Sequence, residues 1–398
     1  MTSKSIVVVG SCMIDFVSFA PRLPKPGETI HGSKFMTTFG GKGANQCVAA
    51  AKLGGNTTLI TRVGDDLWGD KYIENLKCQN VETKYAQKTP NSQSGIAQIT
   101  VAESGENQIV VVAGANNLLT VQDVEKAQDD IIAAAVVVLQ LETSTNVALK
   151  ALKLCQGTSI LNGAPALNKY DPELLTLPTI FCVNETEAAV FTGLSVTNKR
   201  EAEVAIKKLI EQGCNAVIVT LGEQGAICME KNKPGIISVS CPVKQCVDTT
   251  GAGDAFIGAL SFLLANYSDM PLRKILENAC FIASDSVIFL VHFVFIALSS
   301  MGFWNTSAFL FYNFILILLL VWSIYHPQNE EPVQLAIVVN GVSIFLDILL
   351  LVMCYPTNGS VTGLFAGTPQ QSSYEDIDKN IPHPSQSGSY GFANAQQI

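Results

Sequence analysis

The sequence predicts an α/β fold in residues 1–284, in which a parallel sheet covered by helices carries a small β lid, followed by three apolar helices and a polar tail. Three observations indicate this organisation. Strand-like apolar runs alternate with helix-like segments through the middle of the chain. Two hairpin-like segments nearer the N-terminus have no long helix between their strands. After Asp285 the chain becomes strongly apolar and almost uncharged.

Charge divides the 398-residue chain into two parts. Residues 1–285 hold 24 basic and 28 acidic residues, whereas residues 286–398 hold 1 basic and 6 acidic residues. The first part has the charge density of a soluble protein and is long enough for one large domain with a small lid. The acidic balance, with no run of Lys or Arg, argues against a nucleic-acid partner.

Cysteine usage predicts a reducing compartment. The 11 cysteines form no C-x-x-C pair, and no histidine lies close enough to them for a zinc pattern. We therefore expect free thiols and a cytoplasmic location for the first part of the chain. The first 20 residues do not resemble a secretory signal, because their apolar run reaches Asp15 without a small-residue cleavage pattern.

The first predicted strand runs from Ile6 to Gly10. Asp15 follows it, and because α/β sheets bind ligands at the carboxyl ends of their strands, this carboxylate could hold sugar hydroxyls. Taken alone, a plain turn residue explains Asp15 better. The proline-rich residues 21–38 and the alternating residues 95–112 predict two hairpins that form the lid.

A glycine-rich loop, Gly40-Gly-Lys-Gly-Ala-Asn45, precedes an alanine-rich helix at Cys47–Leu53. The glycines permit a ligand to approach the backbone closely, and Asn45 offers donors and acceptors suited to hydroxyl groups. The loop is not a Walker A phosphate loop, since no Lys-Ser/Thr pair follows at the required spacing. By itself it is weak evidence for a site.

The middle of the chain alternates predicted strands, at 134–141, 159–161, 180–183 and 216–221, with predicted helices, at 145–155, 185–192 and 200–212. Glu142 follows the first of these strands. Asn184 and Glu187 follow the third strand and either hold a hydrated magnesium ion or cap the helix that begins there. Thr220–Gly225 ends the last strand with two glycines, which suits nucleotide phosphates.

The motif with the clearest chemistry is Asp248-Thr-Thr-Gly-Ala-Gly-Asp254, which has the pattern of a strand end, a glycine turn and a helix start. Backbone amides at a helix N-terminus form an anion site where charge develops during phosphoryl transfer. Asp254 lies where those amides converge and could take the proton from an attacking hydroxyl. An aspartate that only caps the helix is an equally balanced alternative.

Six motifs in this order resemble the ribokinases of the PfkB carbohydrate kinase family, over residues of about 5–284. They are Gly10–Asp15, Gly40–Asn45, Gln140–Glu142, Asn184–Glu187, Thr220–Gly225 and Asp248–Asp254. Each is ambiguous alone, whereas together they are highly specific. The resemblance implies ATP-dependent phosphorylation of D-ribose at the 5-hydroxyl, with Mg²⁺ and K⁺ as cofactors and a homodimer formed through the lid. Another sugar or nucleoside kinase of the family is the alternative.

The resemblance also implies roles for individual residues. The catalytic group would be Asp254 as general base, with an anion hole formed by Gly251, Ala252 and Gly253. The sugar would contact Met13, Ile14, Asp15, Gly41, Lys42, Gly43, Ala44, Asn45, Glu142 and Asp254. ATP would contact Asn184, Thr220, Leu221, Gly222, Glu223, Gln224, Gly225, Gly253 and Asp254. Potassium would be held by Asp248 and Thr250, and magnesium would be supported indirectly by Asn184 and Glu187.

The resemblance ends before the last segment of the family. Family members continue after the helix that contains Phe281–Ala283 through a further helix and a loop that cover the adenine and complete the potassium site. Apolar sequence takes that place here, and Cys280 stands where close relatives often have Asn. Burial of apolar surface is worth ~25 cal/mol per Å², so a few hundred Å² of exposed core matters against a net stability of ~5–15 kcal/mol. The fold can survive such a loss, while full activity is put at risk.

Three apolar runs then follow, Ser286–Ser300, Ala308–Tyr325 and Val333–Tyr355. They approach the ~20 residues that a membrane-spanning helix requires, and aromatic residues near their ends suit membrane interfaces. Buried helices of a soluble domain are a weak alternative, because almost no charge would face water. Residues 357–398 are rich in Gly, Ser, Gln and Pro, which predicts a disordered tail.

Residues 286–356 resemble the type-1 angiotensin II receptor-associated proteins, notably at Asn313–Leu316, Val321–Trp322 and Ile344–Ile348. The resemblance implies three spans, multi-pass membrane association and a tail that binds a receptor's cytoplasmic segment. Three spans would put the kinase and the tail on opposite sides of the membrane, so one function is compromised or two neighbouring reading frames are joined near Ser284. A membrane adaptor of receptor trafficking with an inactive kinase remnant is therefore the alternative from a different class.

Overall fold

The computed structural model describes residues 4–233, 235–241 and 251–284, which lie within one compact unit, Met1–Leu298. The predicted spans at 286–356 and the predicted tail at 357–398 lie outside the described residues. Within the described part of the chain, no helix is long and apolar enough to cross a membrane. The described residues make up most of the predicted α/β domain.

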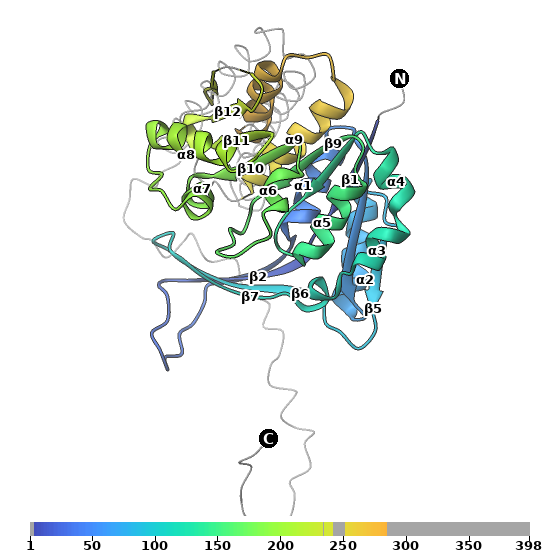
Figure 1. The fold of residues 1–398 in the computed structure, drawn as a ribbon. Coiled ribbons are helices and arrows are strands. Elements are labelled where there is room, and N and C mark those ends of the chain that lie inside the picture. Colours follow the sequence, from blue (N-terminus) through green and yellow to red (C-terminus); the bar gives the residue numbers. More distant parts are fainter. Residues whose placement is uncertain (1–3, 234, 242–250, 285–398) are drawn as a thin grey trace, which may run out of the picture. The chain divides into compact units, whose positions relative to one another are not determined.

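A nine-stranded sheet forms the centre of the domain, in the order β13-β12-β11-β10-β9-β8-β1-β4-β5 (Figure 1). Its strands are β1 (Ser5–Val9), β4 (Asn56–Gly64), β5 (Ala86–Thr89), β8 (Val136–Leu139), β9 (Thr158–Asn162), β10 (Ile180–Asn184), β11 (Ala216–Thr220), β12 (Ala226–Glu230) and β13 (Ile237–Val239). Neighbouring strands from β5 to β11 run parallel, as the sequence predicts.

The prediction of a parallel sheet is wrong for the last two strands. β12 pairs antiparallel with β11, and β13 pairs antiparallel with β12. Only residues 221–225 connect β11 to β12, whereas a parallel pair needs a crossover of about a dozen residues or more. Gly225, with φ at +92°, allows this short connection to turn back, because side chains rarely tolerate that conformation.

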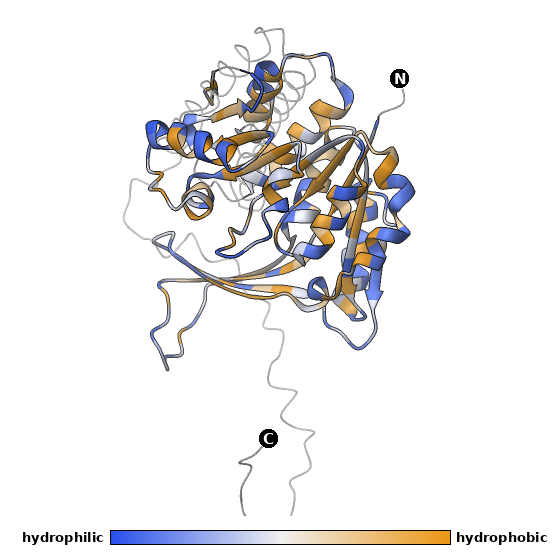
Figure 2. Ribbon diagram, in the orientation of Figure 1, coloured by the Kyte–Doolittle hydropathy of each residue, from blue (hydrophilic) through white to orange (hydrophobic). Residues whose placement is uncertain are grey.

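Helices cover both faces of the sheet, because its central strands are apolar on both sides. Along β1, Ile6 and Val8 belong to one buried cluster, and Val7 and Val9 belong to the other. Figure 2 shows many helices with a hydrophobic side and a hydrophilic side, as expected for helices that cover a sheet.

The helices divide between the two clusters. The face of Ile6 and Val8 is covered by α1 (Lys42–Lys52), α2 (Leu67–Cys78) and α9 (Ala252–Asn266), together with the helical residues 272–284. The other face is covered by α3 (Val121–Lys126), α4 (Gln128–Ala133), α5 (Thr145–Leu154), α6 (Glu173–Thr176), α7 (Glu185–Thr192) and α8 (Lys199–Glu211). Two short 3₁₀ turns, η1 (Gly114–Leu118) and η2 (Gly222–Gln224), lie in connections.

A separate four-stranded sheet has the order β3-β2-β6-β7 (Figure 1). Its strands are β2 (Met13–Ala20), β3 (Lys34–Gly40), β6 (Gly95–Ala102) and β7 (Asn107–Val112). β6 and β7 form an antiparallel hairpin within residues 95–112. The other hairpin differs from the prediction: β3 pairs with β2, which begins at Met13, so the first hairpin starts well before residue 21. Asp15 therefore lies inside this second sheet and not in a turn.

Candidate active site at the start of helices α1 and α9

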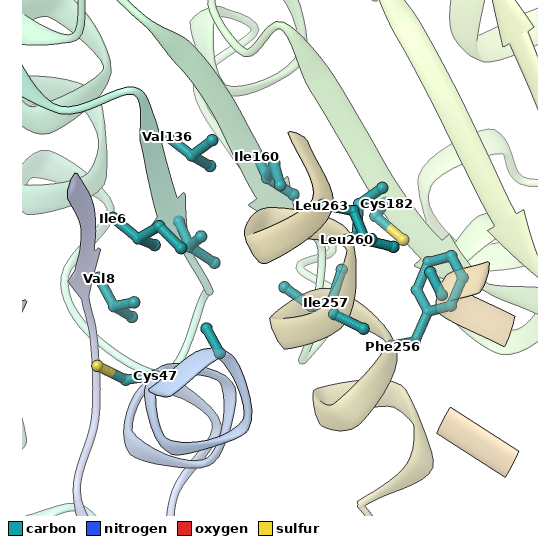
Figure 3. Packing of buried hydrophobic residues seen from close by; sticks show 14 of the residues in the cluster. Ile6, Val8, Cys47, Val136, Ile160, Cys182, Phe256, Ile257, Leu260 and Leu263 are labelled. Carbon is teal, nitrogen blue, oxygen red and sulfur yellow. The ribbon is translucent and has the colours of Figure 1, made fainter. Parts of the chain in front are cut away.

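Helices α1 and α9 pack against each other on one face of the nine-stranded sheet (Figure 3). Cys47 of α1 and Ile257 and Leu260 of α9 belong to the same buried cluster, which fixes the two helices relative to each other. Each helix begins at a glycine of positive φ, Gly41 at +93° and Gly251 at +79°. The packing brings the first turns of the two helices together.

Asp254 lies in the first turn of α9 and meets the first turn of α1. Its Oδ2 accepts a hydrogen bond from Asn45 Nδ2 at 3.0 Å, and its Oδ1 accepts one from Gln46 Nε2 at 2.9 Å. Gly251 occupies the N-cap position of α9, so Asp254 is not merely a cap. A carboxylate fixed by two donors at a helix start has the geometry of a proton acceptor beside an anion site.

The charge state of Asp254 reflects opposed influences. Burial raises the pKa of its carboxyl group, and the charge of Glu142 acts in the same direction. The hydrogen bond from Asn45, the charge of Lys42 and the hydrogen bond from Gln46 act against burial and favour the ionised form. The surrounding donors therefore offset part of the cost of keeping a buried base ionised.

Glu142 lies shortly after β8 and accepts a hydrogen bond from the start of α1. Its Oε2 accepts hydrogen bonds from Ser11 Oγ at 2.5 Å and from the backbone nitrogen of Lys42 at 2.9 Å. A side chain at Gly43 would place its Cβ 2.5 Å from the backbone nitrogen of Ser11, so the loop requires glycine there. Ser11, which was not among the predicted site residues, is fully buried at the end of β1.

Asp15 reaches the same region from the four-stranded sheet. Burial and the nearby charge of Glu142 raise the pKa of Asp15 to about 6. A Cβ atom at Gly40 would lie 2.3 Å from Asp15 Oδ2, so the end of β3 passes directly against this carboxylate. Two acidic groups and the start of α1 thus lie close to each other, and their binding of hydroxyl groups stays a prediction.

A cavity of about 210 Å³ adjoins Asp254. Seven predicted site residues line it: Lys42, Asn184, Glu187, Thr220, Gly251, Gly253 and Asp254. Six further residues, which were not among the predicted site residues, complete the wall: Asn162, Ala164, Cys182, Val183, Phe256 and Ile257. Asn162 had a signal in the sequence, since it is a polar residue at the end of a predicted strand, whereas the apolar wall has none.

Other predicted site residues lie elsewhere. Met13, Ile14 and Ala44 have buried side chains in the core, so they can meet a ligand mainly through their backbone. Leu221 is also buried, and of the segment Thr220–Gly225 only Thr220 lines the cavity. Their predicted contacts with sugar or nucleotide stay predictions.

The predicted magnesium residues form the start of α7. Asn184 is the N-cap residue: its Oδ1 accepts from the backbone nitrogen of Glu187 at 2.8 Å, while Glu187 Oε2 accepts from the backbone nitrogen of Asn184 at 2.9 Å. Both residues line the cavity, and burial raises the pKa of Glu187 while the charge of Lys42 lowers it. Among the described residues no three acidic, His or Cys side chains gather closely enough to hold a metal. These bonds make the pair the cap of α7, which is the alternative that the sequence leaves open, and its support of a magnesium ion through water stays a prediction.

The predicted potassium residues, Asp248 and Thr250, lie outside the described residues. The residues predicted to form an anion hole, Gly251, Ala252 and Gly253, lie at the start of α9, with Gly251 and Gly253 at the cavity.

Comparison with protein families gives two matches along the chain. The pfkB family of carbohydrate kinases matches residues 3–287, and the family of the angiotensin II, type I receptor-associated protein matches residues 282–366. Both regions are those that the sequence motifs indicate.

Individual relatives match the first region. Over 288 residues the chain is 44% identical to the ribokinase of Mus musculus, a match that covers 72% of this chain and 89% of that protein. Over 281 residues it is 36% identical to the deoxyribokinase of Salmonella typhi, covering 69% of this chain and 91% of that protein. Among solved structures, the ribokinase of Arabidopsis thaliana complexed with ribose and ATP is similar with a TM-score of 0.65 and 30% identity, covering 72% of this chain and 93% of that one.

Proposed function

Because the chain belongs to the pfkB family of carbohydrate kinases, we propose that it transfers the γ-phosphoryl group of ATP to the 5-hydroxyl of D-ribose, giving ribose 5-phosphate and ADP. The observation that supports this most directly is Asp254, held at the start of α9 by Asn45 and Gln46 and open to the cavity. The similarity to ribokinases, including one complexed with ribose and ATP, supports the choice of substrates.

In this reaction the 5-hydroxyl oxygen attacks the γ-phosphorus, the bond to the β-phosphate oxygen breaks, and the hydroxyl proton passes to Asp254. The amides of Gly251, Ala252 and Gly253 face the charge that develops on the phosphoryl oxygens. Asp15, Glu142 and the loop Gly41–Asn45 hold the sugar hydroxyls. Removal of water by the bound substrates strengthens each of these interactions.

The nucleotide would occupy the cavity, with Asn184 and Thr220 in its wall. A magnesium ion, held through water by Asn184 and Glu187, would neutralise charge on the transferring phosphates. Asp248 and Thr250 would supply part of a potassium site that orders the anion hole.

The test is ribose phosphorylation by the full chain, purified in detergent, with ATP, Mg²⁺ and K⁺. Asp254→Asn is expected to reduce kcat by about 10³-fold or more, since general-base loss costs ~10²–10⁴-fold, with little change in the KM for ATP. Ser261→Ala is the control, because this buried hydroxyl lies on the same helix and, among the described residues, donates to the backbone carbonyl of Gly258 alone. An unchanged kcat in Asp254→Asn would refute the assignment.

A panel of sugars and nucleosides decides the substrate. Similarity to deoxyribokinases makes 2-deoxyribose the first competitor to measure. A higher kcat/KM for another sugar or for a nucleoside would make that compound the substrate and would leave the proposed kinase activity in place.

The four-stranded sheet supports the proposal of a homodimer through the lid. Ile109, Val110, Val111 and Val112 of its edge strand β7 are between 51% and 64% exposed. A run of apolar residues this exposed on an edge strand favours a protein partner. Sedimentation of the full chain in detergent, compared with Val110→Lys, tests this.

The match at residues 282–366 favours a second candidate, a multi-pass membrane adaptor that binds a receptor tail and carries an inactive kinase remnant. Detergent-dependent solubility together with absent ATP turnover would support it. Sequencing of the transcript across the codons for 270–300 separates a true fusion from two joined reading frames.

A further inference from the structure

Gln46 lies on α1, next to Asn45, and is the centre of a buried group of amide side chains. It is 1% exposed. Its Nε2 donates to Asp254 Oδ1 at 2.9 Å and to Asn162 Oδ1 at 3.1 Å, and its Oε1 accepts from Gln140 Nε2 at 2.7 Å. The amide thus uses both of its donor hydrogens and its acceptor.

The orientation of each amide follows from Asp254, because both of its carboxyl oxygens accept hydrogen bonds from amide nitrogens. A carboxylate only accepts hydrogen bonds, so Gln46 must turn its nitrogen toward it. The oxygen of Gln46 then faces Gln140, which must in turn present its own nitrogen. Asn162 fits the same direction, because its Oδ1 accepts from Gln46 and its Nδ2 donates to the carbonyl of Cys182 at 3.2 Å.

The side chain of Gln140 shows that this orientation of the amides costs free energy. Its side chain is 1% exposed, and among the described residues its Oε1 has no hydrogen-bond partner. A Cβ atom at Gly10 would lie 2.0 Å from this oxygen, so the absence of a side chain at Gly10 makes room for it. A buried acceptor without a partner is unfavourable by ~1–3 kcal/mol. Rotating the amide would satisfy nothing and would turn its oxygen toward that of Gln46.

We propose that Gln140 and Gln46 form a positioning relay, in which Gln140 fixes the amide of Gln46 so that Gln46 holds Asp254 as an oriented, ionised proton acceptor. This inference rests on the proposed function of Asp254. Neither glutamine lines the cavity, so both act through Asp254 and not on the substrate. Within the described part of the chain, the charged groups that act on Asp254 are Lys42 of α1, Glu142 after β8 and Glu187 of α7.

The experiment measures kcat/KM for ribose against pH in the full chain and in Gln46→Met, which keeps the length of the side chain and removes its donors. Loss of a donor to the carboxylate raises the pKa of Asp254, so the acidic limb of the kcat/KM profile is expected to move upward by about one pH unit. The loss of kcat/KM is then largest, at about tenfold, on the acidic side of this limb and becomes small on its alkaline side. A uniform loss at every pH would overturn the relay and leave only a structural role.

Gln140→Met keeps the test decisive if Gln46→Met folds poorly. It removes the unpartnered oxygen of Gln140 but leaves Gln46 Oε1 without its donor, so the two effects on the melting temperature oppose each other and the net change should be small. The acidic limb of the kcat/KM profile should move in the same direction as in Gln46→Met by a smaller amount. An unchanged acidic limb of the kcat/KM profile in Gln140→Met would refute the positioning role of Gln140. The control is Ser261→Ala, in which the lost hydroxyl is buried on α9 and donates to the carbonyl of Gly258. Its kcat/KM profile should have the same acidic limb as that of the wild type.

Infrared titration of the Asp254 carboxyl group, assigned by its loss in Asp254→Asn, reads the protonation of this group without turnover. If the full chain phosphorylates no sugar, the proposed function fails, but this titration still tests the relay. A lower midpoint in the wild type than in Gln46→Met supports it, and equal midpoints contradict it.

Discussion

Gly258 determines how closely α9 can approach α1, and replacing it with alanine should disturb the site from one helical turn away. A Cβ atom at this position would lie 2.4 Å from Ala49 Cβ, 2.8 Å from the carbonyl oxygen of Gln46 and 3.0 Å from the backbone nitrogen of Ala50. Carbon atoms prefer a separation of about 3.5–4.0 Å, so the helices must part by about 1 Å at this point.

The hydrogen bonds to Asp254 cross the same interface. The bonds from Asn45 at 3.0 Å and from Gln46 at 2.9 Å would each lengthen as α9 moves. A displacement of about 1 Å can cost ~10²-fold in rate. The overpacking itself costs about 1–3 kcal/mol, offset by up to about 1 kcal/mol because alanine favours a helix more than glycine does. We therefore expect Gly258→Ala to lose about 10–100-fold in kcat with a stability loss of about 0–3 kcal/mol.

Steady-state kinetics and urea unfolding of the full chain measure the two effects. Gly54→Ala is the matched control, since Gly54 has φ at +90° but no neighbour within 4 Å of a new Cβ atom. It should lose stability by about 1 kcal/mol through backbone strain and keep its kcat. A folded Gly258→Ala with the kcat of the wild type would refute the reasoning, because it would show that the helix separation does not control Asp254.

Three further predictions concern groups around the site. In the ion pair Arg62–Asp123, with N–O distances of 2.7 and 2.8 Å, the carboxylate is buried and the guanidinium is partly exposed. Asp123→Asn should lower the free energy of unfolding by about 1–3 kcal/mol, because the charge of Arg62 loses its partner. Urea unfolding should show a smaller loss in the double variant Arg62→Met/Asp123→Leu than the sum of the losses in the two single variants, and additive losses would contradict this. Burial raises the pKa of Asp15 from 3.8 to about 6, so the cost of ionising this group in the folded state grows from about pH 4, is complete above about pH 6 and is absent below about pH 4. Asp15→Asn should therefore raise the melting temperature at pH 7.5 and not at pH 3.5, and an equal rise at both values would contradict the raised pKa. Asp66 accepts hydrogen bonds from the backbone nitrogen and from Oγ of Ser94, both at 2.7 Å. Asp66→Ala should lower the free energy of unfolding by about 1–2 kcal/mol and speed amide hydrogen exchange along β6. Unchanged exchange along β6 would mean that other contacts hold the strand.

Local signals in the sequence predict some elements well. Helix α7 spans the predicted residues Glu185–Thr192, because Asn184 caps its start and Gly193, with φ at +66°, ends it. Strand β2 has no such signal, since its partners β3 and β6 are set by pairing with distant residues and not by local pattern. The antiparallel pair of β11 and β12 does have a local signal, the short connection 221–225, but the prediction of a uniformly parallel sheet did not use it.

The site shows the same division. Asp254 and Asn45 could be predicted because glycine turns before helices mark places where backbone amides gather. The contacts of Gln46 with Gln140 and Asn162 could not be predicted from sequence, since a buried amide has no distinctive spacing and its role depends on which neighbour it meets. The apolar wall of the cavity is likewise a product of packing.

The order in which a ribosome makes the chain has a consequence for the contact between α1 and α9. Asn45 and Asp254 are 209 positions apart, which corresponds to ~10–40 s of synthesis at ~5–20 residues per second. During that interval α1 and β1 exist without the helix that covers them, and their apolar side chains are open to other proteins. Nascent chains that stop before α9 would therefore depend on chaperones, and the active site can form only when α9 has left the ribosome.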